Sequence, residues 1–370
     1  MKDLLLSKCG LEILIIKEVV VKKSMLLIML LVFITGCDNE TSEKNDNDTE
    51  PVHEIIGRYS DSFGGPHIIS NTVWDQGGMM GRFNIEFFDS ENDVIIAQND
   101  KNNEFSAEKW SRFDYLIDSS KIYFCQIVYD LDTMQEAIDA TGADRVDLDG
   151  GCNGFGWTEL AEIAEESIDK DDALIVAWAN GHESYIPGED LIEDWKTPDK
   201  ATGKAEGTST DIVSLGNGGS IVLTFEKPIT DGDGTDFAVF ENSLSDTFLE
   251  LAFVEVSSDG TNFLRFDTYY LGVDPVDAFG NHDPELIWGF AGKFKQGLGT
   301  QFDLKELETK PEVVDNTVDI SSITHIRIVD VIGDGSEIDT LGNPIYDPYP
   351  TTESAGFDLD AVGVMNVVTD

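Results

Sequence analysis

Short runs in which β-branched and aromatic residues alternate with polar residues recur along the chain. Runs of this kind, bounded by Gly, Asn, Asp and Ser, are typical of strands with one buried face. In the first half they predict strands over residues 67–74, 81–88, 93–97, 113–117 and 121–129. Residues 90–93 and 118–120 are expected to form hairpin loops. One short helix is expected over residues 133–141, with Asp132 as its cap.

The same pattern continues in the second half of the chain. It predicts strands over residues 173–178, 220–225, 236–240, 249–256, 262–266, 323–329 and 357–364. The sequence has no long helical period and no repeated βα unit, so we expect antiparallel pairing. About eight such strands joined by long acidic connections are typical of a jelly-roll β-sandwich. The prediction is therefore a mainly β protein, with a small disulfide-linked β domain over 53–165 and an antiparallel jelly-roll β-sandwich over 170–370.

The N-terminus has a different pattern. Two lysines precede an apolar run over residues 25–34, which has the length of a signal-peptide core and is short for a membrane span. The run ends in Ile34–Cys37, which resembles a bacterial lipobox. We therefore expect residues 1–36 to be a lipoprotein signal peptide and Cys37 to be lipidated. An ordinary signal peptide or a short membrane anchor is the alternative.

The net charge of the chain limits the kinds of partner that an exported protein of this sequence can bind. The chain has 370 residues and a formal net charge of −48, from 72 Asp and Glu against 24 Lys and Arg. This charge argues against a nucleic acid or an anionic membrane surface as partner, and it favours divalent cations. Residues 37–52 are polar and acidic and are expected to form a disordered tether. The expected location is the bacterial cell envelope, at the outer membrane and cell surface or on the periplasmic face, with contact to the membrane through the N-terminal lipid only.

Four cysteines are present, and two of them lie in the expected β-rich domain. In an exported protein Cys125 and Cys152 are expected to pair, because that environment is oxidising. The bridge would close a loop of about 27 residues, which the chain-entropy model values at roughly 3 kcal/mol. A free thiol nucleophile is the alternative.

Five sequence blocks occur in order in the second half. They are Val213–Phe225, Asp236–Asn242, Val254–Gly260, Ile326–Asp330 and Gly356–Val362. Together they resemble a family of bacterial secreted and cell-surface proteins. The turn at Val-Ser-Ser-Asp-Gly and the closing strand Phe-Asp-Leu-Asp-Ala-Val also resemble discoidin-like, galactose-binding-type β-sandwiches. The resemblance implies a β-sandwich at the cell surface with ligands on the loops at one end, and it implies no biochemical activity.

Calcium is the best-supported cofactor, because Ca²⁺ prefers six to eight oxygen ligands on loops that can wrap it. The candidate ligands are Asp231, Asp233, Asp236, Asp330, Asp358 and Asp360. The first three alternate with glycines, although the spacing does not complete an EF-hand. Asp358 and Asp360 lie two apart on a strand and share one face. The alternative is a set of solvated acids that stabilise turns, which is also the favoured interpretation of Asp144, Asp147 and Asp149.

Motifs for catalysis are weak. The five histidines are scattered, no Cys-x-x-Cys occurs, and no Gly-x-Ser-x-Gly or Walker A motif is present. Enzyme activity is therefore not expected, and no catalytic residues are assigned.

Aromatic residues in or near the loops favour a binding role. They are Trp178, Tyr185, Trp195, Tyr269, Tyr270, Trp288, Tyr346 and Tyr349. The leading hypothesis is a lipid-anchored surface or periplasmic binding protein, with a calcium-stabilised sandwich that recognises a glycan, a matrix component or a small ligand. The alternatives are an exported hydrolase acting on polysaccharide and a structural envelope protein.

Overall fold

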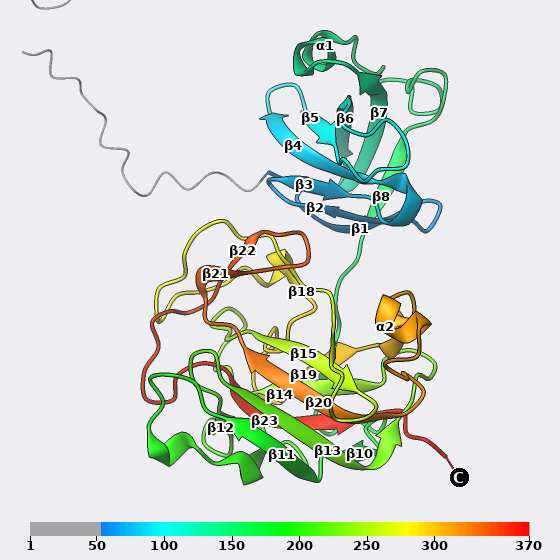
Figure 1. Cartoon of the computed structure of the whole chain (residues 1–370). Helices are drawn as coiled ribbons and strands as arrows, with labels where there is room; N and C mark the ends of the chain where they lie inside the picture. Colours follow the sequence, from blue (N-terminus) through cyan, green and yellow to red (C-terminus); the bar gives the residue numbers. More distant parts are fainter. Residues whose placement is uncertain (1–52, 370) are drawn as a thin grey trace, which may run out of the picture. The chain divides into compact units, whose positions relative to one another are not determined.

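A computed structural model describes residues 53–369 of the chain (Figure 1). The predicted signal peptide, tether and lipidated Cys37 lie outside these residues. The fold is mainly β and its sheets are built from antiparallel pairs, as predicted. Within residues 53–369, no helix combines the length and the apolar character needed to cross a membrane.

The first eight strands form a closed barrel, where the sequence predicted only a β-rich domain. They are β1 (Gly57–Asp61), β2 (Pro66–Ile69), β3 (Val73–Asp75), β4 (Arg82–Asp89), β5 (Val94–Asn99), β6 (Trp110–Asp118), β7 (Lys121–Leu131) and β8 (Thr158–Glu162). Each strand pairs with the next in sequence, and β1 also pairs with β8, which closes the barrel. Aromatic rings fill its interior: Trp74 packs on Phe113 and Phe124, with ring centroids 4.5 and 5.1 Å apart.

Two local predictions in the barrel need correction. The strand expected over 67–74 is two strands, because the Ser70 hydroxyl accepts hydrogen bonds from the backbone N–H groups of Thr72 and Val73 and forms a tight turn. The helix α1 (Met134–Asp139) is capped by Thr133 in a capping box with Glu136, whereas Asp132 was expected as the cap.

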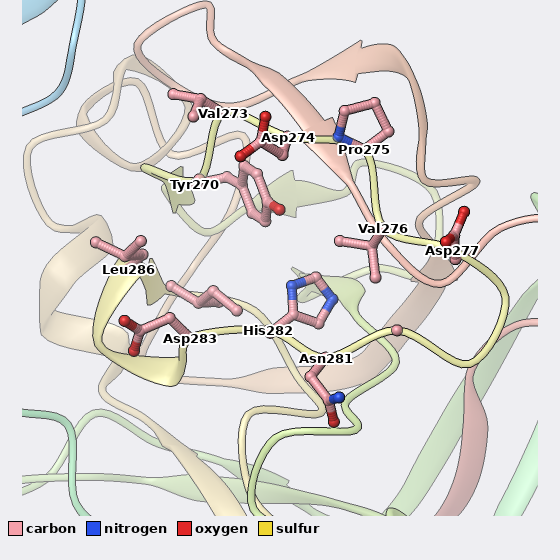
Figure 2. A pocket seen from close by; sticks show the side chains of 13 residues that line it. Tyr270, Val273, Asp274, Pro275, Val276, Asp277, Asn281, His282, Asp283 and Leu286 are labelled. Carbon is pink, nitrogen blue, oxygen red and sulfur yellow. The ribbon is translucent and has the colours of Figure 1, made fainter. Parts of the chain in front are cut away.

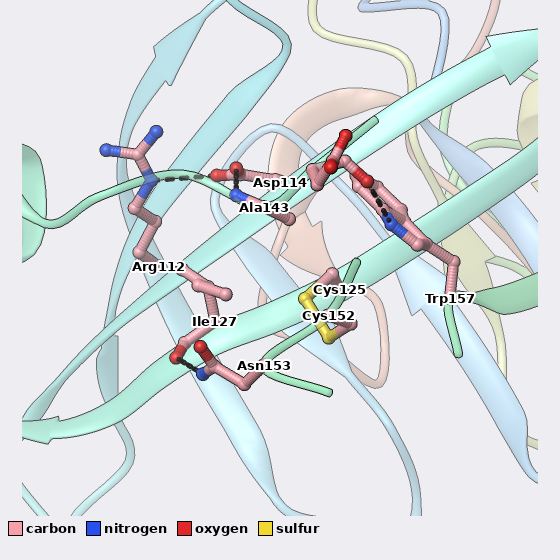
Figure 3. Close-up of a disulfide and its surroundings, with 9 residues drawn as sticks. Arg112, Asp114, Cys125, Ile127, Ala143, Cys152, Asn153 and Trp157 are labelled. Atoms are coloured by element: carbon pink, nitrogen blue, oxygen red, sulfur yellow. Dashed lines mark hydrogen bonds and ion pairs between the residues drawn. A yellow bond between two sulfur atoms is a disulfide. The ribbon is translucent and has the colours of Figure 1, made fainter. Parts of the chain in front are cut away.

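The predicted disulfide is confirmed. Cys125 on β7 is bonded to Cys152, with their Cα atoms 5.7 Å apart (Figure 3). Next to the bridge, the side-chain amide of Asn153 donates a hydrogen bond of 2.7 Å to the carbonyl of Ile127. The Gly-rich segment after α1 is therefore attached to β7 by both a covalent bond and a hydrogen bond.

Residues 167–369 contain two larger antiparallel sheets. The first has the order β10 (Ala177–Trp178), β23 (Asp358–Val364), β14 (Phe237–Glu241), β19 (Leu298–Phe302) and β9 (Ser167–Asp169), and β12 (Val213–Ser214) also pairs with β23. The second has the order β11 (Gly181–Ile186), β13 (Ser220–Ile229), β20 (Ile323–Asp330), β15 (Ala252–Ser257) and β16 (Leu264–Arg265). Because β9 pairs with β19, this region begins slightly before the predicted residue 170.

Short elements complete the fold. They are the paired strands β17 (Tyr269–Tyr270) and β18 (Ile287–Trp288), the paired strands β21 (Asp334–Ile338) and β22 (Pro344–Tyr346), the helix α2 (Pro311–Val314), and the 3-10 turns Gly78–Met80, Glu193–Trp195, Pro198–Ala201, Pro284–Leu286 and Leu304–Leu307. The predicted strand over 173–178 is present only as β10, because residues 172–175 form a turn in which the N–H of Ile175 donates to the carbonyl of Asp172.

One hydrophobic core contains side chains from both larger sheets. Phe237 on β14 and Leu359 on β23 belong to the first sheet, and Val254 on β15 and Ile328 on β20 belong to the second. All four are buried. The alternation that predicted these strands is therefore the pattern that places their apolar side chains in a shared core.

Candidate functional site

A cavity in residues 167–369, which we call the second region, combines aromatic and acidic side chains. Its volume is about 340 Å³, and its lining includes Trp195, Asn242, Phe248, Glu250, Phe279 and Asp358. We call it the carboxylate cavity. Asn242 directly follows β14, Glu250 lies two residues before β15, and Asp358 begins β23. Strand termini from both larger sheets therefore supply its polar groups.

Asp358 is held in place by two donors. Its Oδ2 accepts a hydrogen bond of 3.1 Å from the side-chain amide of Asn242, and its Oδ1 accepts one from the hydroxyl of Ser214. The side chain is only 5% exposed. Burial raises the pKa of Asp358 to about 7, against the lowering effect of these two hydrogen bonds.

Glu250 also lines the cavity, but its carboxylate accepts fewer hydrogen bonds than that of Asp358. It is 7% exposed, and its carboxylate receives no hydrogen bond from any residue in the described part of the chain. Burial raises the pKa of Glu250 well above its ordinary value, and the charges of Asp358 and Glu241 raise it further. Ionising this carboxylate without a positive partner is therefore costly.

Glu241, at the end of β14, is a third acid in electrostatic reach. It is 1% exposed, and its Oε2 accepts a hydrogen bond of 2.7 Å from the backbone N–H of Ser243. Its Oε1 has no hydrogen-bond partner among the described residues. Burial, followed by the charge of Asp358, raises the pKa of Glu241 well above the usual range.

Apolar side chains accompany these acids. Phe279, which lines the cavity, is 89% exposed, and Leu244 beside it is also exposed. Trp195 and Phe248 are partly buried. Aromatic faces next to buried hydrogen-bonding groups are the combination found in sites for small polar ligands.

Figure 2 shows a second cavity of about 340 Å³. It shares one loop with the first, since Asp277 and Gly280 line the second cavity and Phe279 lines the first. Tyr270 and His282 line it and make an edge-to-face contact, with ring centroids 5.9 Å apart. The Nε2 of His282 lies 3.0 Å from Oδ1 of Asp347. Burial lowers the pKa of His282 to about 4 and raises that of Asp347, so both shifts favour a neutral pair. This pair is a buried hydrogen bond beneath the loop.

The structure brings together only part of the predicted calcium set. Oxygen atoms of Asp231, Asp236 and Asp303 lie within 4.8 Å of one another, and among the described residues this is the acidic group with such spacing. Asp233 is not in the group, and Asp303 was not predicted. Asp303 is distant in sequence, and its local signal is that of a cap, since it accepts a hydrogen bond from the N–H of Lys305.

Asp330 and Asp360 are buried hydrogen-bond acceptors. Asp330 accepts bonds of 2.7 and 2.6 Å from the backbone N–H groups of Gly218 and Phe357. Asp360 accepts bonds of 3.0 and 2.7 Å from those of Glu206 and Gly207. Asp358 lies on the same strand as Asp360 but lines the carboxylate cavity. The described structure does not bring these three aspartates together at ligand spacing.

Other expected residues have local partners. Asp144 accepts a hydrogen bond from the N–H of Val146, and Asp147 accepts one from that of Gly150, as in turns. Among the loop aromatics, Tyr270 and Trp288 are buried in the fold.

Sequence reasoning missed Glu241 and Glu250. The available signal was their position: Glu241 ends the run Phe-Ala-Val-Phe, and Glu250 stands between Leu249 and Leu251. A charged residue inside a buried apolar run calls for a partner.

Comparisons with known proteins add little to this geometry. No family model matches the chain, and no curated protein matches it. One solved structure, named a glycoside hydrolase, aligns with 10% sequence identity and a TM-score of 0.20, covering 83% of this chain and 69% of its own. A likeness this low carries no argument about fold or activity.

Proposed function

We propose that this is an exported, lipid-anchored envelope protein whose second region binds a glycan in the carboxylate cavity. The observation that carries the proposal is the exposed ring of Phe279 beside the buried carboxylates of Glu250 and Asp358. An aromatic face can stack on the apolar face of a sugar ring, and carboxylates accept hydrogen bonds from its hydroxyl groups.

The expected jelly-roll sandwich belongs to this proposal. Two antiparallel sheets around one core are consistent with it. In the discoidin-like proteins that the sequence blocks resemble, loops at one end of the sandwich bind the ligand. Lipidation at Cys37 and the acidic tether over 37–52 would present this region at the envelope.

A glycan array with the mature chain tests the binding role. Phe279→Ala should weaken binding of any glycan that the array identifies by roughly twofold to tenfold, because an aromatic contact contributes about 0.5–1.5 kcal/mol. Phe155→Ala is the matched control, since Phe155 is also strongly exposed but lies in the segment before β8. Equal binding by both variants would contradict the assignment of the site, and an empty array would favour a structural envelope role.

Hydrolysis of a polysaccharide is the second candidate. Glu250 and Asp358 line the same cavity and both have raised pKa values, which is the environment that general acids use in glycosidases. Turnover on a polysaccharide panel that is lost in Glu250→Gln would establish this activity. Binding without turnover would exclude it for the substrates tested.

Calcium at Asp231, Asp236 and Asp303 remains a proposal for structural support. Their spacing supports it, although Asp236 already accepts hydrogen bonds from the backbone N–H groups of Gly232 and Leu304. Chelation should lower the melting temperature, and Ca²⁺ should restore it better than NaCl of equal ionic strength. Restoration by NaCl alone would show that the acids are merely screened.

A further inference from the structure

The acids around the carboxylate cavity have no described positive partner. The charged groups that act most strongly on Glu250 are all acidic: Asp358, Glu241, Asp347 and Asp330. Placing carboxylates together in a buried site costs several kcal/mol for each ion unless a positive charge or hydrogen bonds compensate. The question is what supplies that compensation.

Elsewhere in the second region, hydrogen bonds compensate for the cost of burying a carboxylate. Both oxygens of Asp330 accept backbone N–H groups, and so do both oxygens of Asp360. Around the carboxylate cavity, the number of hydrogen bonds that each acid accepts falls from Asp358 to Glu250. Among the described residues, each oxygen of Asp358 has a donor, one of the two oxygens of Glu241 has no hydrogen-bond partner, and Glu250 has no donor.

Two of these acids, Glu250 and Asp358, line the cavity, whereas Glu241 does not. Glu250 is nine-tenths buried, yet it lines a cavity of about 340 Å³. Asp358 lines the same space, and each of its oxygens retains a second lone pair beyond the hydrogen bond it accepts. A positive ligand that enters the cavity would therefore meet two carboxylates, and both interact electrostatically with Glu241.

We propose that the carboxylate cavity binds a divalent cation of the calcium type through Glu250 and Asp358, and that hydroxyl oxygens of a glycan complete its coordination. The part of this inference that concerns the glycan rests on the proposed function, whereas the ion site does not. Ca²⁺ is the fitting class because it takes oxygen ligands in flexible geometry, with six to eight positions to fill. Two protein carboxylates leave several positions open, which water fills in the absence of a ligand.

The cation would also decide which glycans bind. Two neighbouring hydroxyl groups on a sugar ring can both reach one ion, while the ring packs against Phe279 or Trp195. The site would therefore select sugars with vicinal hydroxyl groups, and methylation of those hydroxyls would abolish binding.

Terbium luminescence offers a direct test, because Tb³⁺ occupies calcium sites and is sensitised by a nearby indole ring. The mature, chelator-treated protein is titrated with Tb³⁺ under tryptophan excitation, and Ca²⁺ is then added as competitor. We expect a saturable signal that Ca²⁺ displaces, at least tenfold weaker Tb³⁺ affinity in Glu250→Gln, and a weaker signal at unchanged Ca²⁺ affinity in Trp195→Phe. Asp303→Asn is the matched control, since it removes an acid from the other proposed calcium site and should leave the part of the signal that Glu250→Gln removes unchanged.

Folding is controlled separately, because Glu250→Gln keeps the shape of the side chain and its melting temperature in chelator can be compared with that of the parent. A signal that is equal in Glu250→Gln and the parent overturns the ion site.

Repeating the glycan array in chelator separates the two proposals. Glycan binding that persists without a cation overturns this inference and leaves the proposed function intact. A cation held at Glu250 with no glycan bound on the array supports the ion site and overturns the proposed function.

Discussion

Asp330 accepts a hydrogen bond of 2.6 Å through its Oδ1 from the backbone N–H of Phe357. Asp330 ends β20 in one sheet, and Phe357 directly precedes β23 in the other. The second oxygen of Asp330 accepts a bond of 2.7 Å from the N–H of Gly218. One buried carboxylate therefore connects the two sheets and the turn before β13.

Replacing this carboxylate should destabilise the second region strongly. Asp330→Ala leaves two backbone N–H groups without their acceptor, and each buried unsatisfied donor costs about 1–3 kcal/mol. We expect the free energy of unfolding to fall by about 2–6 kcal/mol, measured by urea denaturation. Asp233→Ala, at an exposed position, is the control. Similar stability for the two variants would show that the Asp330 contacts contribute little.

Loss of the disulfide should destabilise the barrel. The bridge joins residues 27 apart in sequence, so its removal restores the conformational freedom of that loop in the unfolded chain. The double substitution of Cys125 and Cys152 by Ala should reduce the free energy of unfolding by roughly 3 kcal/mol. Denaturation of the parent with and without reductant should show a similar difference, and a reductant-insensitive parent would contradict the prediction.

Acid should weaken the turn between β15 and β16. Backbone N–H groups of Asn262 and Thr261 donate to the carboxylate of Asp259 and lower its pKa far below the ordinary value. Because the folded state holds the proton less tightly than the unfolded state, this contribution is complete above about pH 4 and is lost as the pH falls further. Asp259→Ala should thus melt earlier than the parent at pH 7, and the difference should shrink towards pH 2. A difference that does not change with pH would point to packing.

Lipidation is tested at Cys37, which lies outside the described residues. Cys37→Ala should release the protein from the membrane fraction or leave an uncleaved precursor. Labelling with a fatty-acid analogue is the measurement, and unchanged labelling of the variant would exclude this cysteine as the acceptor.

The sequence predicted those features that depend on residues close together in the chain, such as individual strands. The alternation in residues 121–129 predicted β7, and the expectation of an oxidising environment predicted the partner of Cys125. The closure of the barrel was not predictable in this way. It depends on pairing between β1 and β8, such as Tyr59 with Glu162, which are about a hundred residues apart.

The candidate site shows the same division. Asp231 and Asp236 are close in sequence and the structure brings them together, whereas Asp303 joins them only through the pairing of β14 with β19. Glu250 became a candidate only when the fold placed it beside Asp358 in one cavity. Side chains from distant segments meet because the sheets pair, and a single sequence does not specify that pairing.

The closure of the barrel has a mechanical consequence. Any pulling force that reaches the folded part through residues before Gly57 is applied first to β1, which is hydrogen-bonded to β2 on one side and to β8 on the other. A terminal strand at the edge of an open sheet detaches by breaking one ladder, but β1 can leave only by breaking two. If Cys37 anchors the chain as proposed, tension on that anchor would therefore act on a strand held by two ladders of hydrogen bonds.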